Sequence, residues 1–455
     1  MRTSRWRTHA LPALLVSLGL VGAACGSDSD ESSATTATEA PATTDSATTD
    51  SAAPETTEAA APTTDAAAPD TTEAAVACDG DPIVMTMIVS LSGPLGFASR
   101  EADNNNGLEA ALAAVNHDCT AGRPLDIKVC DDKSDPNEST TCGREAAENG
   151  SIAIFGETGS SENGVTTSGL PGVMLSGSGQ FDLINPLAYS SINTVTQMLG
   201  AVSAAKGAGM QSFVFVAPDV PAAQFGVGIA VEHGKSLGMD MQALFFPADT
   251  TDFTSAAAQV SGLAPDAIGV IVPATLPFFT ALEAEGITPK DTAFFTAVAL
   301  MPPDVIESLD GKAEGMYLVT PDVPAQDTTN AGIQQMQEEW DAAGITDDFS
   351  KAGVFAVSNW SKVHSLATIL GSLSPDAIAA LDSTALADAL VAAGPFTPLA
   401  SAPFDFSAHA LPGIEALAPF RVFGDEIMVT QVTDGTYKVI SDFGSVAQAI
   451  PLNEG

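Results

Sequence analysis

The stretch from Asp81 to Asn116 constrains the fold most, because it predicts a buried strand, a polar turn and an amphipathic helix in succession. The apolar run Ile83–Leu91 is short and rich in β-branched residues, which is typical of a strand buried on both faces. Ser92-Gly93-Pro94 ends this strand, since proline cannot donate to a β-ladder. The following helix has one apolar stripe, formed by Leu108, Ala111, Leu112 and Val115. This is the first half of a βαβ unit, and ligands bind outside the carboxyl ends of strands in such sheets.

Predicted strands and helices alternate along the rest of the folded part. This alternation predicts an α/β fold with parallel sheets covered on both faces. The stretch 420–440 predicts a terminal hairpin with Asp434-Gly435 as its turn. The other predicted strands are 125–130, 152–155, 173–175, 213–217, 242–246, 268–272, 293–296 and 316–319. The predicted helices include 138–148, 196–207, 225–237, 253–262, 277–285, 331–343, 352–371 and 384–393.

The composition of the first 81 residues indicates a signal for export followed by a tether, and not a folded domain. Residues 1–25 combine an arginine-bearing start, an apolar segment too short to span a bilayer, and small residues before Cys25. This pattern resembles a bacterial lipoprotein signal, with Cys25 lipidated; an ordinary secretory signal cut after Ala24 is the alternative. Residues 26–81 are mostly Ala, Thr, Ser, Pro, Asp and Glu, and this composition predicts a disordered acidic tether. We therefore expect an exported protein, lipid-anchored to the outer face of the cell membrane.

Charge excludes some partners. The formal net charge is −41 over 455 residues, which argues against nucleic acid and anionic membrane surfaces as partners. Contact with the membrane is therefore expected only through the lipid anchor. The roughly 370 residues after the tether are enough for two domains of ordinary size.

Four cysteines, an even number, lie in the predicted exported domain, so disulfides are expected. Cys78 precedes the first predicted strand and Cys119 follows the first helix, at one end of the sheet. Cys130 ends the second strand and Cys142 lies early in the next helix, at the opposite end. Of three possible pairings, these positions favour Cys78–Cys119 and Cys130–Cys142. A zinc site is the rival interpretation, although no C-x₂-C pair is present.

Three segments in order, LSGP after the first strand, AAVN ending the helix and IKVCDDKSDPNES beyond it, carry a family resemblance. They are similar to the opening of the leucine/isoleucine/valine-binding protein family, the type I solute-binding proteins of ABC importers. The resemblance extends from about Pro82 to about Val446. It implies two Rossmann-like lobes with parallel central sheets joined by a three-segment hinge, with lobe 1 formed by 82–195 and 321–413 and lobe 2 by 196–320 and 414–449. It also implies a small-molecule ligand held between the lobes by hinge closure, the membrane subunits of an ABC importer as partners, and no cofactor.

The ligand-binding residues expected in lobe 1 lie in loops after predicted strands. The loop Gly156–Ser161 offers hydroxyls and free N–H groups at a helix start, which suit a carboxylate. In the resemblance this loop holds the ligand's carboxylate, with Ser160 at the main serine position; plain N-capping is the alternative. The full set expected in lobe 1 is Ser92, Phe97, Thr158, Gly159, Ser160, Ser161, Ser178, Gly179 and Gln180.

In lobe 2 the resemblance implies contacts from Asp219, Phe225, Thr275 and Val298. Phe225 stands where the family has a tyrosine stacked over the ligand. Amino-acid binders of the family carry an acidic residue near Val298 to pair the ligand's ammonium, but this sequence has Ala297-Val298-Ala299-Leu300. Burying an ammonium without a partner is costly. Unless Asp219 or Glu157 substitutes, the pattern favours a carboxylate, an amide or another less cationic molecule over an α-amino acid.

The sequence does not predict an enzyme. It contains no metalloprotease or nucleophile-elbow motif, and the histidines are scattered, as surface or internally satisfied histidines are. No metal site or cofactor is expected. Two other functions remain open: a ligand sensor acting through a membrane receptor, and a non-binding cell-surface protein on the same fold.

Overall fold

The computed structural model describes residues 78–92, 101–156, 161–177, 180–272, 276–408, 414, 417 and 420–453, with side chains undescribed at 101–104, 161 and 181. All of them belong to the second of two compact units, Thr72–Gly455. The predicted signal with Cys25, and the predicted tether up to residue 77, lie outside the described residues.

The first sheet contains five parallel strands in the order β2-β1-β3-β4-β5. Its central strand β1 is the predicted apolar run, and six of its seven residues are buried. The strands are β1 (Ile83–Val89), β2 (Leu125–Asp131), β3 (Ile154–Phe155), β4 (Gly172–Gly177) and β5 (Ala188–Asn193).

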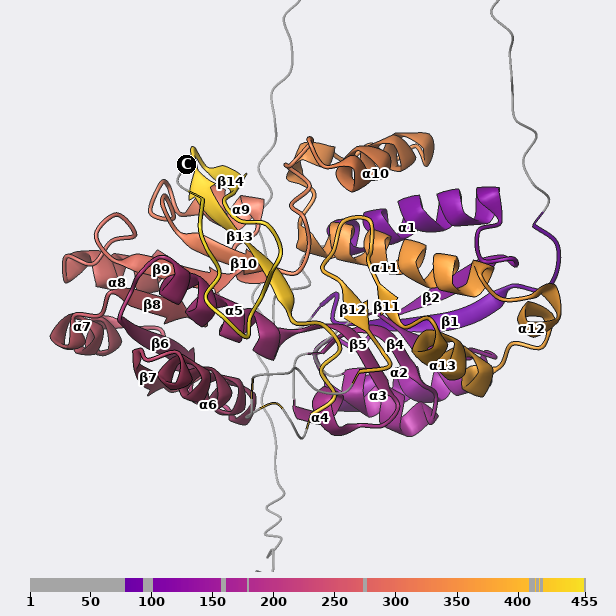
Figure 1. The fold of residues 1–455 in the computed structure, drawn as a ribbon, viewed down its shortest axis with the longest axis horizontal. Helices are drawn as coiled ribbons and strands as arrows, with labels where there is room; N and C mark the ends of the chain where they lie inside the picture. The colour runs from indigo at the N-terminus through magenta and orange to yellow at the C-terminus, as the bar shows by residue number, and fades with distance from the viewer. Residues whose placement is uncertain are drawn as a thin grey trace, which may run out of the picture. The chain divides into compact units, whose positions relative to one another are not determined.

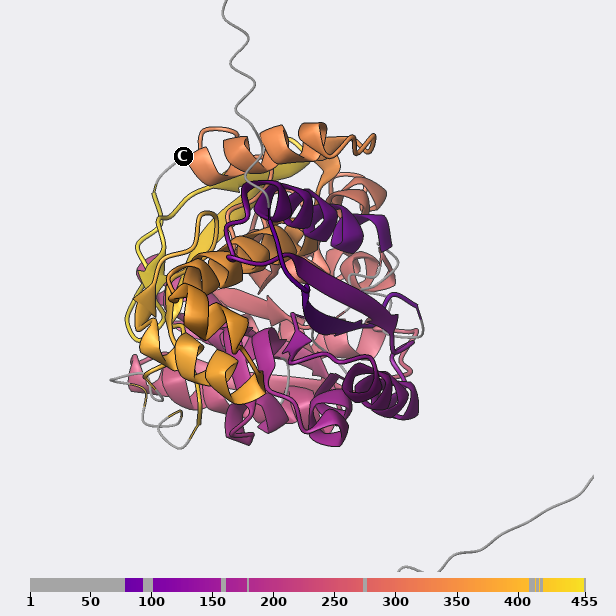
Figure 2. The ribbon, with the colours of Figure 1, turned by 90° about the vertical axis from the view of Figure 1, so that its right-hand side faces the viewer.

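Helices cover both faces of this sheet, as parallel strands require. On one face the main helices are α1 (Glu101–Asp118), α10 (Ala331–Ala342) and α11 (Val354–Gly371), with α1 beside α11 in Figures 1 and 2. The opposite face packs on α2 (Pro136–Glu148) and α3 (Ser161–Ser168) through a smaller apolar cluster. The remaining elements are α4 (Gln180–Ile184), η2 (Phe349–Lys351), α12 (Pro375–Ala379), α13 (Ser383–Ala392) and the short pair β11 (Pro395–Phe396) and β12 (Phe404–Asp405).

The second sheet has the order β14-β13-β10-β9-β8-β6-β7, with β15 paired to β13. The five strands from β10 to β7 are parallel, and β13 and β14 add an antiparallel hairpin at the β10 edge. The strands are β6 (Ser212–Pro218), β7 (Asp240–Phe246), β8 (Ala267–Val270), β9 (Ala293–Ala297), β10 (Tyr317–Thr320), β13 (Glu426–Thr433), β14 (Thr436–Val439) and β15 (Gly444–Ser445).

Alternate residues of these strands point to opposite faces and build two separate cores. Phe213 and Phe215 pack with α5 (Thr194–Gly207) and α6 (Pro221–Ser236). Val214 and Val216 pack on the other face. The helical segments of that face are α7 (Thr254–Leu263), α8 (Leu276–Ala284), η1 (Val298–Leu300) and α9 (Pro303–Ser308).

The structure contains both disulfides of the predicted pairing. The Cα atoms are 5.0 Å apart in Cys78–Cys119 and 5.9 Å apart in Cys130–Cys142, within the usual range for disulfides. Because all four cysteines are in disulfides, the rival zinc interpretation does not hold.

The predicted hairpin is shorter than expected. Asp434 and Gly435 form its turn with φ of 52° and 75°, as a type I′ turn requires. The first strand begins only at Glu426, however, so 420–425 is not part of the hairpin. The Arg421 amide instead donates to the Leu183 carbonyl (2.7 Å). This segment is one of three chain crossings between the two sheets; the others are at 193–194, between β5 and α5, and at 320–323, after β10.

Candidate functional site

The two sheets repeat one strand order. Reading from the edge, β2-β1-β3-β4-β5 in the first sheet corresponds to β7-β6-β8-β9-β10 in the second. In this order the switch point lies between β1 and β3, and between β6 and β8, and ligands bind outside the carboxyl ends of the strands there. We call the carboxyl ends of β1, β3 and β4 the lobe 1 edge, and those of β6, β8 and β9 the lobe 2 edge. The predicted binding residues all follow strands of these two edges.

The described residues cover only part of the predicted site. Ser92, Gln180, Asp219, Phe225 and Val298 are described, and Ser161 begins α3 with its side chain undescribed. Their roles toward a ligand stay predictions. The predicted contacts outside the described residues are Phe97, Thr158, Gly159, Ser160, Ser178, Gly179 and Thr275.

At the lobe 1 edge, Ser92 holds the end of β1 against the end of β2. Its hydroxyl donates to Asp131 Oδ2 (2.6 Å), while Asp131 Oδ1 accepts the amides of Leu91 and Lys133, each at 2.9 Å. Burial pushes the pKa of Asp131 upward, but these hydrogen bonds outweigh it and hold that pKa below its usual value. The Ser92 hydroxyl proton is thus already committed, so Ser92 would meet a ligand as an acceptor.

Sequence reasoning missed Lys362 on α11, which is only 3% exposed. Its Nζ donates to the carbonyl oxygen of Gly156, just after β3 (3.1 Å), and to the hydroxyl of Ser176, near the end of β4. Lys362 therefore links the two strands that lead into the predicted carboxylate loop and the loop after β4. No sequence motif marks it, because its position depends on how α11 packs across the sheet.

Beside this lysine, the end of β5 adds buried polar groups close to Gly177. Ser190 Oγ and Asn193 Nδ2 are both buried without a hydrogen-bond partner. A Cβ atom on Gly177 would lie 2.9 Å from each of them. Asn193 Oδ1 also caps α5 by accepting the Val195 amide (2.8 Å). The lobe 1 edge is thus polar down to the first chain crossing.

At the lobe 2 edge, the exposed Asp219 lies just before α6, and Phe225 lies within the first turns of that helix. Asp219 Oδ1 accepts from Gln224 Nε2. The half-buried ring of Phe225 makes an edge-to-face contact with Phe420 at 5.5 Å. Phe225 therefore contacts the third chain crossing, and a change in lobe orientation would alter this contact.

The place of the family's acidic residue is apolar in the structure. Val298 is 3% exposed and packs in the core of lobe 2. No acidic residue lies between 293 and 301, so this segment offers no partner for a ligand's ammonium.

A small cavity of about 50 Å³ lies beneath the lobe 2 edge, between the first turns of α5 and the ends of β8 and β9. Its walls include Met198, Phe215, Ile271 and Phe295. One polar atom stands out there, because Gln197 contributes to the wall and its Oε1 is buried without a hydrogen-bond partner.

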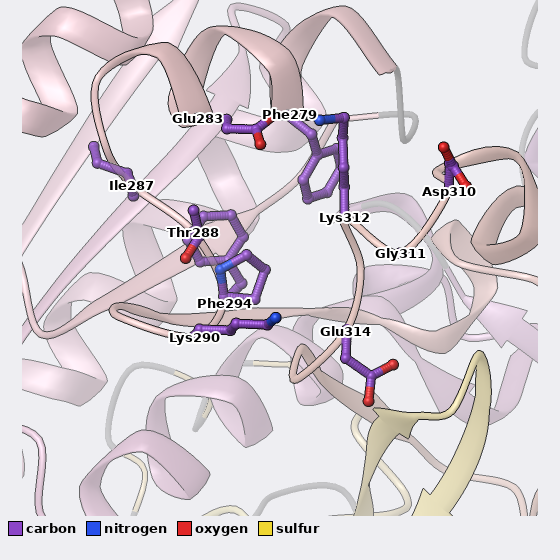
Figure 3. A pocket seen from close by; sticks show the side chains of 11 residues that line it. Phe279, Glu283, Ile287, Thr288, Lys290, Phe294, Asp310, Gly311, Lys312 and Glu314 are labelled. Carbon is purple, nitrogen blue, oxygen red and sulfur yellow. Dashed lines mark hydrogen bonds and ion pairs between the residues drawn. The ribbon is translucent and has the colours of Figure 1, made fainter.

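A larger pocket of about 240 Å³ opens at the opposite end of lobe 2 (Figure 3). Ile287–Lys290 before β9 and Asp310–Glu314 before β10 line it, so it lies at the amino ends of the strands. Lys312 forms an ion pair there with Glu283, and Glu314 accepts the Asp434 amide of the hairpin turn (3.0 Å). Glu283, Lys312 and Glu314 thus serve structural contacts, and the strand-end rule favours a ligand at the other end of the sheet.

The described histidines have internal roles or are exposed, as the sequence predicts. His233 is buried, with its Nε2 3.0 Å from Ser203 Oγ, which donates to the Val446 carbonyl (2.7 Å). Burial lowers the pKa of His233, and the hydrogen bond at Val446 opposes this only in part. His364 Nε2 lies 2.7 Å from Glu339 Oε2, and the exposed His117 contacts Asp118.

Within the described residues, no group of histidine, cysteine and acidic side chains could hold a metal ion. Within the same residues, no helix is both long and apolar enough to cross a membrane.

Comparison with known proteins identifies the fold. Residues 82–422 match the family model described as periplasmic binding protein. No curated protein matches the chain. Among solved structures, an ABC transporter substrate-binding protein from Aeropyrum pernix superposes with a TM-score of 0.67 at 17% identity, covering 81% of this chain and 97% of its own.

Two further solved structures are of proteins named with a bound or transported molecule. A solute-binding protein from Rhodopseudomonas palustris in complex with 4-hydroxybenzoate has a TM-score of 0.64 at 16% identity, covering 82% of this chain and 98% of its own. A putative branched-chain amino acid ABC transporter protein from Rhodospirillum rubrum has a TM-score of 0.56 at 17% identity, covering 79% and 100%. At these identities the likeness establishes the fold alone. The family match covers most of the chain and agrees with the prediction that it is not an enzyme: the chain belongs to the periplasmic binding protein family.

Proposed function

We propose that this chain is an exported, lipid-anchored solute-binding protein that captures a small organic molecule between its two lobes and delivers it to an ABC importer. The ligand docks first on the lobe 1 edge and then bridges to the lobe 2 edge. Only contacts made in the closed state shift the open–closed equilibrium. Lobe 2 contacts such as Phe225 therefore control closure.

The repeated strand order is the observation that carries this proposal. Two sheets of the same order each present a switch point, and the predicted binding residues follow the strands of both. A single such edge would suit many functions. Two of them in one chain, linked by three crossings, suit a ligand held between lobes.

The crossings have the contacts expected of a hinge. Arg421 Nη2 donates to the Ala188 carbonyl (3.3 Å), and its guanidinium lies 5.2 Å from the rings of Tyr189 and Phe423. These contacts tie the third crossing to the strand that leads into the first. A rigid body movement of the lobes would turn about this linked pair.

The ligand we favour has a carboxylate or amide and no ammonium. The sequence of the loop after β3 offers hydroxyls that suit a carboxylate, whereas the segment around Val298 is apolar and contains no acidic residue. Solved relatives named for complexes with benzoate and 4-hydroxybenzoate are compatible with this class. Each charge-assisted hydrogen bond to a carboxylate would contribute about 1.5–3 kcal/mol.

A ligand search tests the proposal directly. Small molecules released from the natively purified protein are identified by mass spectrometry, and each is returned to the ligand-free protein in a thermal-shift titration. We expect at least one compound to raise Tm in a saturable manner. Absence of any bound or stabilising compound would instead support the non-binding surface protein.

The carboxylate loop has its own test. We expect Ser160→Ala to weaken binding of the identified ligand at least several-fold, because a hydroxyl donor is lost. Thr167→Ala, an exposed threonine on the adjacent helix, is the matched control and should leave the isotherm unchanged. Equal affinity of both variants would remove Ser160 from the site.

The anchor and the importer are tested together. Cys25→Ala should release the exported protein from the membrane fraction, while the unaltered chain stays with it. Crosslinking of ligand-loaded protein should capture importer membrane subunits; capture of a signalling receptor instead would identify the chain as a sensor.

A further inference from the structure

The small cavity beneath the lobe 2 edge has an unusual combination of walls. Thr194, Gln197 and Met198 of α5 form one side, and Ile271 and Ala297 after β8 and β9 form another. Apart from the threonines and Gln197, the described part of the walls is apolar, and it includes no charged residue. The cavity therefore rejects an ammonium or a second carboxylate, because neither charge would find a partner.

Gln197 supplies the observation that indicates a ligand, which is an unpaired acceptor in the cavity wall. Its side-chain carbonyl oxygen Oε1 is buried and has no hydrogen-bond partner among the residues that the structure describes. Buried acceptors are nearly always paired in folded proteins, so an unpaired one points to a missing donor. The hydroxyls of the two threonines in the wall do not meet the need, because Thr296 Oγ1 donates to the Val270 carbonyl (2.6 Å) and Thr194 Oγ1 donates to the Gly177 carbonyl (3.3 Å).

The volume of the cavity limits which chemical group can carry this donor. The cavity is about 50 Å³, whereas a cavity that binds benzene has about 150 Å³ and one water needs about 10–15 Å³. An aromatic ring would not fit as a whole. A ring edge with one hydroxyl or one N–H group, or a few water molecules, would fit.

We propose that this cavity receives the end of the ligand remote from lobe 1, and that this end carries a hydroxyl or N–H that donates to Gln197 Oε1. The inference rests on the proposed function, and it narrows the ligand class to organic acids with an apolar body and a terminal hydrogen-bond donor. A hydroxybenzoate has this chemistry; an α-amino acid with an aliphatic side chain does not.

The test compares two acids that differ by one hydroxyl. Binding of 4-hydroxybenzoate and benzoate to the full exported chain is measured by calorimetry for the unaltered protein, Gln197→Leu and Gln211→Leu. Leucine keeps much of the glutamine's volume but removes the acceptor; Gln211 is an exposed control before β6. We expect at least tenfold tighter binding of 4-hydroxybenzoate to the unaltered protein, because a site built for a hydroxyl rejects the analogue that lacks it.

In Gln197→Leu this preference should disappear, through weaker binding of 4-hydroxybenzoate alone, whereas Gln211→Leu should keep it. Several results would overturn the inference: a preference that survives in Gln197→Leu, equal binding of both acids by the unaltered protein, or a ligand-loaded structure in which only ordered water contacts Gln197. If neither acid binds but another molecule co-purifies and rebinds, the proposed ligand class is wrong, while the solute-binding function is supported. If no molecule binds at all, both the ligand class and the solute-binding function are wrong.

Discussion

Lobe 1 and lobe 2 share a strand order but differ in how they are held together. Lobe 1 has both disulfides, the buried Lys362 and a hydrogen-bonded pair, Glu339 and His364, between α10 and α11. Lobe 2 has no cysteine; its two faces pack on phenylalanine-rich cores, and an antiparallel hairpin widens its sheet. Under the proposed function, the shared strand order indicates where the ligand would bind in each lobe, and the side chains make the lobe 1 edge more polar than the cavity beneath the lobe 2 edge.

Reduction of the disulfides is the strongest way to separate the lobes. By loop entropy alone, opening Cys78–Cys119, whose cysteines are 41 positions apart in the sequence, should cost about 4 kcal/mol. Opening Cys130–Cys142, whose cysteines are 12 positions apart, should cost about 3 kcal/mol. Urea unfolding with and without reductant measures the total loss in free energy of unfolding. Hydrogen exchange shows which lobe is destabilised. We expect faster exchange in lobe 1 only; equal acceleration in lobe 2 would mean that the lobes unfold as one unit.

The next largest effect on stability is expected from replacing glycines in α1 and α6 with alanine. A Cβ atom at Gly107 on α1 would overlap the backbone carbonyl of Ala356 on α11, whereas Gly228 on α6 faces open space. Gly107→Ala should therefore destabilise the protein by about 3 kcal/mol. Gly228→Ala should stabilise it by up to about 1 kcal/mol, because alanine favours the helix. Chemical denaturation of both variants checks the pair, and a harmless Gly107→Ala would show that α1 and α11 can separate.

The hydrogen bonds of Glu339 in lobe 1 should contribute somewhat less to the free energy of unfolding. Glu339 Oε2 accepts from the fully buried Trp360 Nε1 (2.6 Å) and lies 2.7 Å from His364 Nε2. Glu339→Ala should cost about 1–3 kcal/mol, because the indole N–H is left buried without a partner. Glu338→Ala, at the exposed neighbouring position, is the control. Equal Tm values for the two variants would contradict this assignment.

The smallest effect we expect is in lobe 2, where the free energy of unfolding should depend on pH through His233. Burial lowers the folded-state pKa of His233 below the ordinary value of 6.5, so the unfolded chain binds the proton more readily. Stability from this group is complete above pH 6.5, declines as pH falls through that value, and levels off below the folded-state pKa. The free energy of unfolding of the unaltered protein, minus that of His233→Gln, should follow this curve.

Local patterns predicted much of the fold correctly. The apolar run of β1, the stripe on α1 and the Asp434-Gly435 turn all describe contacts between residues near one another in the chain or on a single face. The disulfide pairing followed because strand direction places cysteines at one end of a sheet or the other. The strands of the candidate edges were found for the same reason, and their ends indicate where binding residues should lie.

β5 was missed because its sequence, AYSSIN, is polar and becomes a strand only by pairing with β4. The segment 420–425 was assigned to the hairpin because nothing local distinguishes a strand from a crossing that packs on β5. Lys362 and Gln197 gave no signal, since a lone lysine or glutamine on a helix is ordinarily at the surface.

The sequence by itself determined the alternation of strands and helices, the turn chemistry and the cysteine pairing, because these depend on periodicity and on chain direction. Only the tertiary structure decided which helix residues face the strand ends, placing an amine under one edge and an unpaired amide oxygen under the other. The physical reason is that burial and hydrogen bonding at these positions are set by residues far away in the chain, which come together only when the sheets and helices pack.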